Sequence, residues 1–121
     1  MVAALEPQDM ADLAAFYAEM PAAEGISKNE DIELAQQIYR GGITSAGIPA
    51  CSGCHGPAGA GNDAAKFPRL AGQNAEYTAL ALQNFRSGAR ANDPGSMMRM
   101  VAHRLSDREI LALSNYLQGL Y

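Results

Sequence analysis

The sequence predicts an all-α protein in which a few helices surround a long central loop, and three observations support this prediction. Apolar residues recur at helical spacing in several separate segments, and no stretch shows the apolar–polar alternation of a half-buried strand. Residues 41–69 are rich in Gly, Pro and Ala, and loops of this length in compact domains usually have a functional reason. The chain has 121 residues, of which 48% are hydrophobic, enough for one domain with its own core.

The first predicted helix lies in residues 5–17 and has a counterpart near the end of the chain. Its sequence LEPQDMADLAAFY aligns without gaps onto LSDREILALSNYL at residues 105–117. The apolar positions share one helical face, with Met10, Leu13 and Tyr17 matching Ile110, Leu113 and Leu117. Two amphipathic helices can match by chance over so short a stretch. We favour the interpretation that residues 1–20 are the closing helix of a preceding, mostly absent, copy of the same domain.

A polar linker at residues 21–30 follows, and a second helix is predicted from Asp31 to Arg40. The pair Gly41-Gly42 ends this helix in the usual manner of a C-cap. We therefore divide the chain into residues 1–24, the remnant helix with linker, and residues 25–121, the main domain.

The central loop contains the sequence CSGCH, a C-x-x-C-H box that is the attachment signature of a c-type heme. The thiols of Cys51 and Cys54 can each add to one vinyl group of a single porphyrin, and His55 is then held beneath the iron as its proximal ligand. A redox dithiol would be expected in a βαβ context, which this sequence does not show. A structural zinc site needs four protein ligands, and beyond the three residues of the box the sequence offers only His103 as a further His or Cys ligand. The box therefore predicts one covalently attached heme c and no disulfide framework.

Two further helices complete the predicted domain. The third covers residues 74–86 and ends at Gly88; its apolar residues are Tyr77, Leu80, Ala81 and Phe85. An irregular stretch with a turn at Asp93-Pro94-Gly95 follows it. The last helix covers residues 107–118, with a capping box of Ser106 and Glu109 and a stripe of Ile110, Leu113, Leu117 and Leu120.

The composition limits the partners and the location. The formal net charge of −4 without a basic stripe argues against a nucleic-acid partner and is compatible with a basic docking face on a redox partner. No apolar run approaches the roughly 18 residues of a membrane span, so we expect a soluble protein. No secretion leader precedes the domain, although heme is attached to such boxes outside the bacterial cytoplasm. We expect that a leader has been removed or that the sequence begins partway through a longer precursor.

A six-coordinate electron-transfer heme needs a distal ligand, and a thioether raises the reduction potential because it favours ferrous iron. Met97, Met98 and Met100 all qualify by their chemistry, and at least two of the three must instead fill space in the core. His103 offers a bis-histidine alternative, but we expect this side chain to be exposed or to face a heme propionate.

Residues 30–121 resemble one domain of the diheme cytochromes c4, a branch of the class I cytochromes c. The matching stretches, in the order of the family, are IYRGG, GIPACSGCHGPAGAGN, FPRLAGQNAEY, NFRSGARANDPGSMM and LSDREILALSNYLQGL. The closing YLQGL is most similar to the second, C-terminal heme domain. The resemblance implies a class I cytochrome c fold, with few helices wrapped around one heme. A complete cytochrome c4 has another box in its first half, so two-heme transfer within this sequence is excluded.

The resemblance also implies the site residues. The distal iron ligand is expected to be Met98, seven residues before Leu105. Pro68 is expected to present its backbone carbonyl to the second ring nitrogen of His55, which orients the imidazole and increases its basicity.

The implied function is electron transport in a respiratory chain, with iron cycling between Fe(III) and Fe(II) and no enzymatic activity. The expected partners are a quinol-oxidising complex and a terminal oxidase. The expected location is the bacterial periplasm, with peripheral association with a membrane left open. The alternative is a peroxidase-like or ligand-binding heme protein with an open distal site, which requires that none of the three methionines reach the iron.

The first helix also predicts self-association. Its apolar face, formed by Met10, Leu13, Phe16 and Tyr17, is costly in water, at about 25 cal/mol per Å² of apolar area. We expect the outer surface of the main domain or a neighbouring chain to bury this face. The neighbouring chain is favoured because the linker gives the helix reach.

Overall fold

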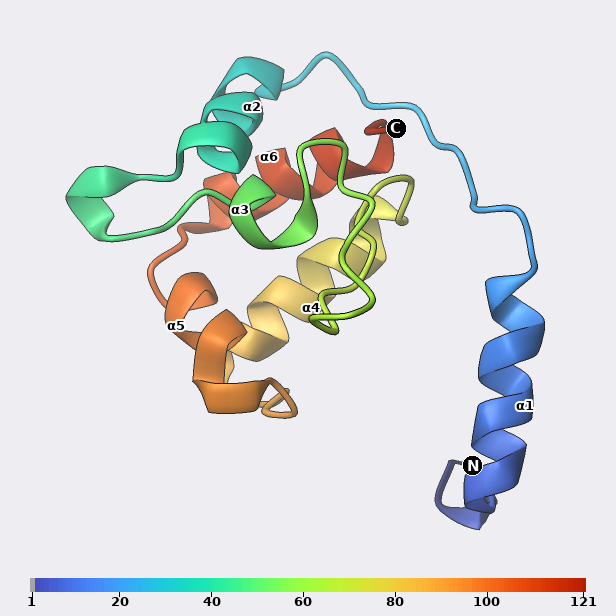
Figure 1. The fold of residues 1–121 in the computed structure, drawn as a ribbon. Helices are drawn as coiled ribbons and strands as arrows, with labels where there is room; N and C mark the ends of the chain where they lie inside the picture. Colours follow the sequence, from blue (N-terminus) through green and yellow to red (C-terminus); the bar gives the residue numbers. More distant parts are fainter. Residues whose placement is uncertain (1) are drawn as a thin grey trace.

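The computed structural model describes residues 2–121, and Met1 lies outside the described residues. These residues form helices and loops, and the β pairing among them consists of two isolated bridges (Figure 1). The helices are α1 (Pro7–Ala18), α2 (Ile32–Gly41), α3 (Ser52–His55), α4 (Ala75–Ser87), α5 (Met97–Ala102) and α6 (Asp107–Gln118), with short 3-10 turns at Val2–Ala4, Thr44–Ala46 and Pro94–Ser96. The predicted all-α fold is confirmed.

The core of the domain is organised around α6. This helix packs against both α2 and α4, and α4 packs in turn against α5 (Figure 1). The predicted stripe of α6 is buried, and only Leu120 at its end is partly exposed. The predicted capping box is also present, because the Ser106 amide donates to Glu109 Oε2 at 2.7 Å and the Glu109 amide donates to Ser106 Oγ at 3.3 Å. Capping and periodicity therefore determine where α6 begins and which face it buries.

The apolar residues named for α4 are only partly buried. Tyr77 and Leu80 are 52% and 54% exposed, whereas Thr78, Ala79 and Phe85 are buried. Ala79 belongs to the same core cluster as the apolar residues of α6. Small side chains allow two helix axes to approach closely, so the face that packs need not carry the largest residues.

The short helix α5 was not predicted. Its six residues, MMRMVA, follow two residues with left-handed backbone angles, Gly95 at φ 62° and Ser96 at φ 58°. A helix of fewer than two turns shows no periodicity that a sequence pattern could reveal.

Helix α1 stands apart from the rest of the protein (Figure 1), and none of its residues is buried. Met10 and Leu13 are 44% and 43% exposed, and Phe16 and Tyr17 are 62% and 65% exposed. The main domain therefore does not cover this apolar face in the structure. No helix within residues 2–121 is both long and apolar enough to cross a membrane.

The later part of the linker, residues 26–30, is bound to α6. The side-chain oxygen of Asn115 accepts the Lys28 amide at 2.8 Å, and its side-chain nitrogen donates to the Lys28 carbonyl at 2.8 Å. The Gln118 side chain donates to the Ile26 carbonyl at 2.9 Å. A Cβ at Gly25 would collide with the Gln118 carbonyl, so the glycine permits the close approach.

Candidate heme site

Helix α3 is a single turn that begins directly after Cys51. The Cys51 carbonyl accepts hydrogen bonds from the amides of Cys54 at 3.2 Å and His55 at 2.9 Å. Positions three apart on one turn lie on the same side of a helix. The two cysteines are not joined to each other, so both thiols are available for thioether formation.

His55 is buried, with 6% of its surface exposed. Its Nδ1 lies 2.8 Å from the carbonyl oxygen of Pro68, and the ring of Phe67 is 6.2 Å away between centroids. A carbonyl oxygen can only accept, so Nδ1 carries a hydrogen, and in the neutral imidazole the free lone pair is then on Nε2. This is the arrangement of a metal-binding imidazole whose second nitrogen is held by the protein.

The loop after α3 determines where the Pro68 carbonyl lies. The Gly61 amide donates to the His55 carbonyl at 2.8 Å, and Asn62 and Phe67 exchange two backbone hydrogen bonds at 2.8 and 2.9 Å. Gly61 has φ +80°, and a Cβ there would lie 2.5 Å from the Phe67 oxygen and 2.7 Å from the Arg69 nitrogen. Only glycine fits this close turn, which places Pro68 against the imidazole.

Tyr39 of α2 contacts the backbone directly after the C-x-x-C-H box. Its side chain is fully buried, and its hydroxyl donates to the Gly56 carbonyl at 2.6 Å. Burial, with smaller contributions from Cys51 and Tyr116, raises the pKa of Tyr39 to about 12. This role was not predicted from the sequence, although a tyrosine on a core face signals that its hydroxyl needs a partner.

Burial raises the pKa of the Cys51 thiol to about 11, so this thiol is protonated at neutral pH. Within residues 2–121, no group of three or more His, Cys, Asp or Glu side chains is arranged to hold a metal ion.

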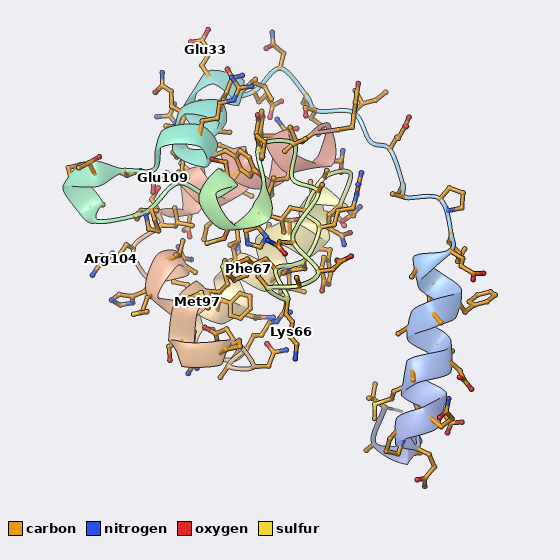
Figure 2. All side chains as sticks on the ribbon, viewed as in Figure 1. Glu33, Lys66, Phe67, Met97, Arg104 and Glu109 are labelled. Carbon is orange, nitrogen blue, oxygen red and sulfur yellow. The ribbon has the colours of Figure 1, made fainter. Side chains whose placement is uncertain are left out.

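The three candidate distal methionines lie on α5 and differ in exposure. Met97 and Met100 are 41% and 59% exposed, whereas Met98 is half-buried. Figure 2 labels Met97 on α5 and Phe67 on the loop that follows α3. His103 is exposed at the end of α5, as expected. Of the three methionines, Met98 is therefore the most buried.

These residues fit a heme c. The site offers two unpaired thiols on one turn, a buried imidazole with a free Nε2, and a half-buried thioether on a separate helix. Thioether attachment with imidazole and methionine as axial ligands uses this donor set.

Comparisons with known proteins give the family. The cytochrome c family model matches residues 32–121. The chain is 53% identical over 121 residues to cytochrome c4 of Thiocapsa roseopersicina, covering 99% of this chain and 63% of that protein. It is 39% identical over 119 residues to the thiosulfate dehydrogenase electron acceptor of Stutzerimonas stutzeri (strain A1501), covering 96% of this chain and 55% of that protein.

Among solved structures, reduced recombinant cytochrome c4 from Pseudomonas stutzeri superimposes with a TM-score of 0.94 at 45% identity, covering 97% of this chain and 62% of that chain. The predicted class I cytochrome c fold and the similarity to the C-terminal domain of cytochrome c4 are thereby confirmed. The chain spans less than two thirds of the length of each of these relatives.

The family match and the spacing of the box agree on the cofactor. Cys51 and Cys54 stand in the C-x-x-C-H spacing within the matched region, which supports one covalently attached heme c. The chain belongs to the cytochrome c family.

Proposed function

We propose that this protein is an electron-transfer cytochrome in which His55 and Met98 are the axial ligands of the heme iron and Pro68 orients His55. The observation that carries the proposal is the exposure of the methionines on α5, where Met98 is half-buried and its two neighbours are exposed. The hydrogen bond between His55 and Pro68 supports the proximal side, because it leaves Nε2 free for a metal.

The residues of the chain would set the reduction potential of the iron and keep other ligands away from it. When bound, the heme supplies a one-electron couple between Fe(III) and Fe(II). The Met98 thioether favours the reduced form, whereas the Pro68 carbonyl makes the His55 imidazole more basic and favours the oxidised form. Keeping both ligands in both states limits rearrangement on electron transfer and leaves no position for a substrate, so we expect no enzymatic activity.

The alternative is an open distal site, as in a peroxidase-like or ligand-binding protein. An optical spectrum of the ferric protein distinguishes the two functions. Thioether ligation is expected to give a weak charge-transfer band at the red end of the visible spectrum. A ferric protein without this band that binds small ligands without competition would refute the proposed function.

We propose further that the protein acts in the bacterial periplasm, as an electron carrier of a respiratory chain. A quinol-oxidising complex would donate electrons and a terminal oxidase would accept them. Because one relative bears the name of a thiosulfate dehydrogenase electron acceptor, a thiosulfate-oxidising enzyme is an alternative donor. Stopped-flow reduction of the ferric protein by each donor would decide between them.

The domain division also remains a proposal. Residues 1–24 would be the closing helix and linker of a preceding heme domain, and residues 25–121 the heme domain described above. The exposed apolar face of α1 supports this division, since the matching face of α6 is buried by α2 and α4.

A further inference from the structure

A charged pair joins the loop that leads to α5 to this helix. The Asp93 side chain is 4% exposed, and its two oxygens accept from the Arg99 amide at 3.0 Å and from Arg99 Nε at 2.8 Å. Arg99 also donates from Nη2 to the Ala91 carbonyl at 3.4 Å. Although burial alone would raise the pKa of Asp93, the hydrogen bonds from Arg99 lower this pKa overall, so the carboxylate is charged. The pair thus joins Asp93, within the loop, to Arg99, the residue directly after Met98.

The backbone between the two partners is strained. Gly95 and Ser96 are consecutive residues in the left-handed region, at φ 62° and 58°, and they directly precede α5. Glycine adopts this region freely, but serine does so at a cost in energy. Such a conformation persists only where surrounding contacts hold it. The contacts between Asp93 and Arg99 close the loop around this turn.

We propose that Asp93 and Arg99 are a pair of positioning residues that holds α5 in the orientation in which Met98 ligates the iron. This inference rests on the proposed ligation by Met98. Without the pair, the turn at Gly95 and Ser96 can relax, α5 can rotate or move outward, and the sixth coordination position opens more often. The pair therefore sets the fraction of molecules in which an external ligand can replace the methionine.

The test is titration of the ferric heme protein with imidazole, read from the optical spectrum. Asp93→Asn keeps the shape of the side chain and removes its charge. Hydrogen bonds to charged groups are strong enough that their loss should increase the apparent affinity for imidazole about 10- to 100-fold, because this affinity scales with the open fraction. The thioether band should also weaken in the variant before imidazole is added.

Asp31→Asn is the matched control. Asp31 also accepts two hydrogen bonds from one arginine, Arg108, at 3.0 and 2.7 Å, but it precedes α2 rather than α5. We expect imidazole binding in this variant to stay within about twofold of the unmodified protein. Equal affinities in all three proteins, or an equal increase in both variants, would overturn the inference.

A second variant keeps the test decisive if Asp93→Asn fails to fold. Arg99→Gln removes the guanidinium but keeps the amide that donates to Asp93, so a smaller increase in imidazole affinity is expected. An Arg99→Gln protein with unchanged affinity would refute the positioning role of Asp93 and Arg99. Absence of the thioether band from the unmodified protein would instead refute the proposed ligation, and the positioning role with it.

Discussion

Nδ1 of His55 lies 2.8 Å from the carbonyl oxygen of Pro68, 13 residues further along the chain. The imidazole is on a helix, but its partner is on a loop whose course depends on a tight turn at Gly61. The orientation of His55, the proposed proximal ligand, therefore depends on backbone packing outside the C-x-x-C-H box.

Gly61→Ala is expected to destabilise the protein more than Gly88→Ala. Both glycines have φ near +80°, so both substitutions carry the left-handed penalty of roughly 1–2 kcal/mol. A Cβ at Gly88 would meet nothing within 4 Å, whereas one at Gly61 would lie 2.5 Å from the Phe67 oxygen. We expect the free energy of unfolding, measured with denaturant, to fall roughly twice as far for Gly61→Ala. Equal losses would show that the loop yields without cost.

Met98→Ala is expected to abolish the thioether band and to let the ferrous protein bind carbon monoxide. The reason is that no other side chain of α5 is expected to ligate the iron. Met97→Ala and Met100→Ala are the matched controls, since these side chains are exposed on the same helix, and they should keep the band. Loss of the band in one of these controls instead would place the ligand one or two residues away.

Tyr39→Phe is expected to change how stability depends on pH. The pKa of Tyr39 is raised to about 12 in the folded protein, from 10.0, so the folded state retains the proton that the unfolded state releases. The stabilisation is complete below about pH 10 and is lost as the pH rises toward 12.

At neutral pH the substitution should cost about 1 kcal/mol through the lost hydrogen bond to Gly56. The difference in unfolding free energy between the two proteins should shrink above pH 10 and change sign before pH 12, because two pKa units correspond to roughly 2–3 kcal/mol. A difference that is constant across this range would contradict the assignment. Cys51 does not titrate once it forms a thioether, so it should not obscure the result.

The exposed face of α1 is expected to cause self-association at high protein concentration. Leu13→Gln combined with Phe16→Gln should reduce the sedimentation coefficient toward that of a monomer, since burial of these side chains drives the contact. Ala11→Gln combined with Ala15→Gln alters exposed positions off that stripe and serves as the control. A monomer at every concentration, with freely exchanging amides in α1, would show that this segment is a tail with no partner.

Much of the fold and the site can be predicted from the sequence because the signals are local. Periodicity locates α2, α4 and α6, and the capping box of Ser106 and Glu109 is formed by residues three apart. The C-x-x-C-H box carries its own spacing, so it indicates heme attachment without knowledge of the fold. The resemblance adds Pro68 and Met98, whose roles as iron-site residues stay predictions.

The tertiary structure alone decides the contacts between residues that are distant in sequence. Asn115 binds Lys28 across 87 residues, and Tyr39 binds the Gly56 carbonyl across 17. Neither pairing has a spacing rule, because each depends on how the packed helices bring two segments together. The contact between Asp93 and Arg99 could not be predicted either. It spans a turn with two left-handed residues and the start of a six-residue helix, and neither shows a periodicity in the sequence. Local pattern therefore determines where helices form and where the heme is attached, and packing determines which groups hold its ligands.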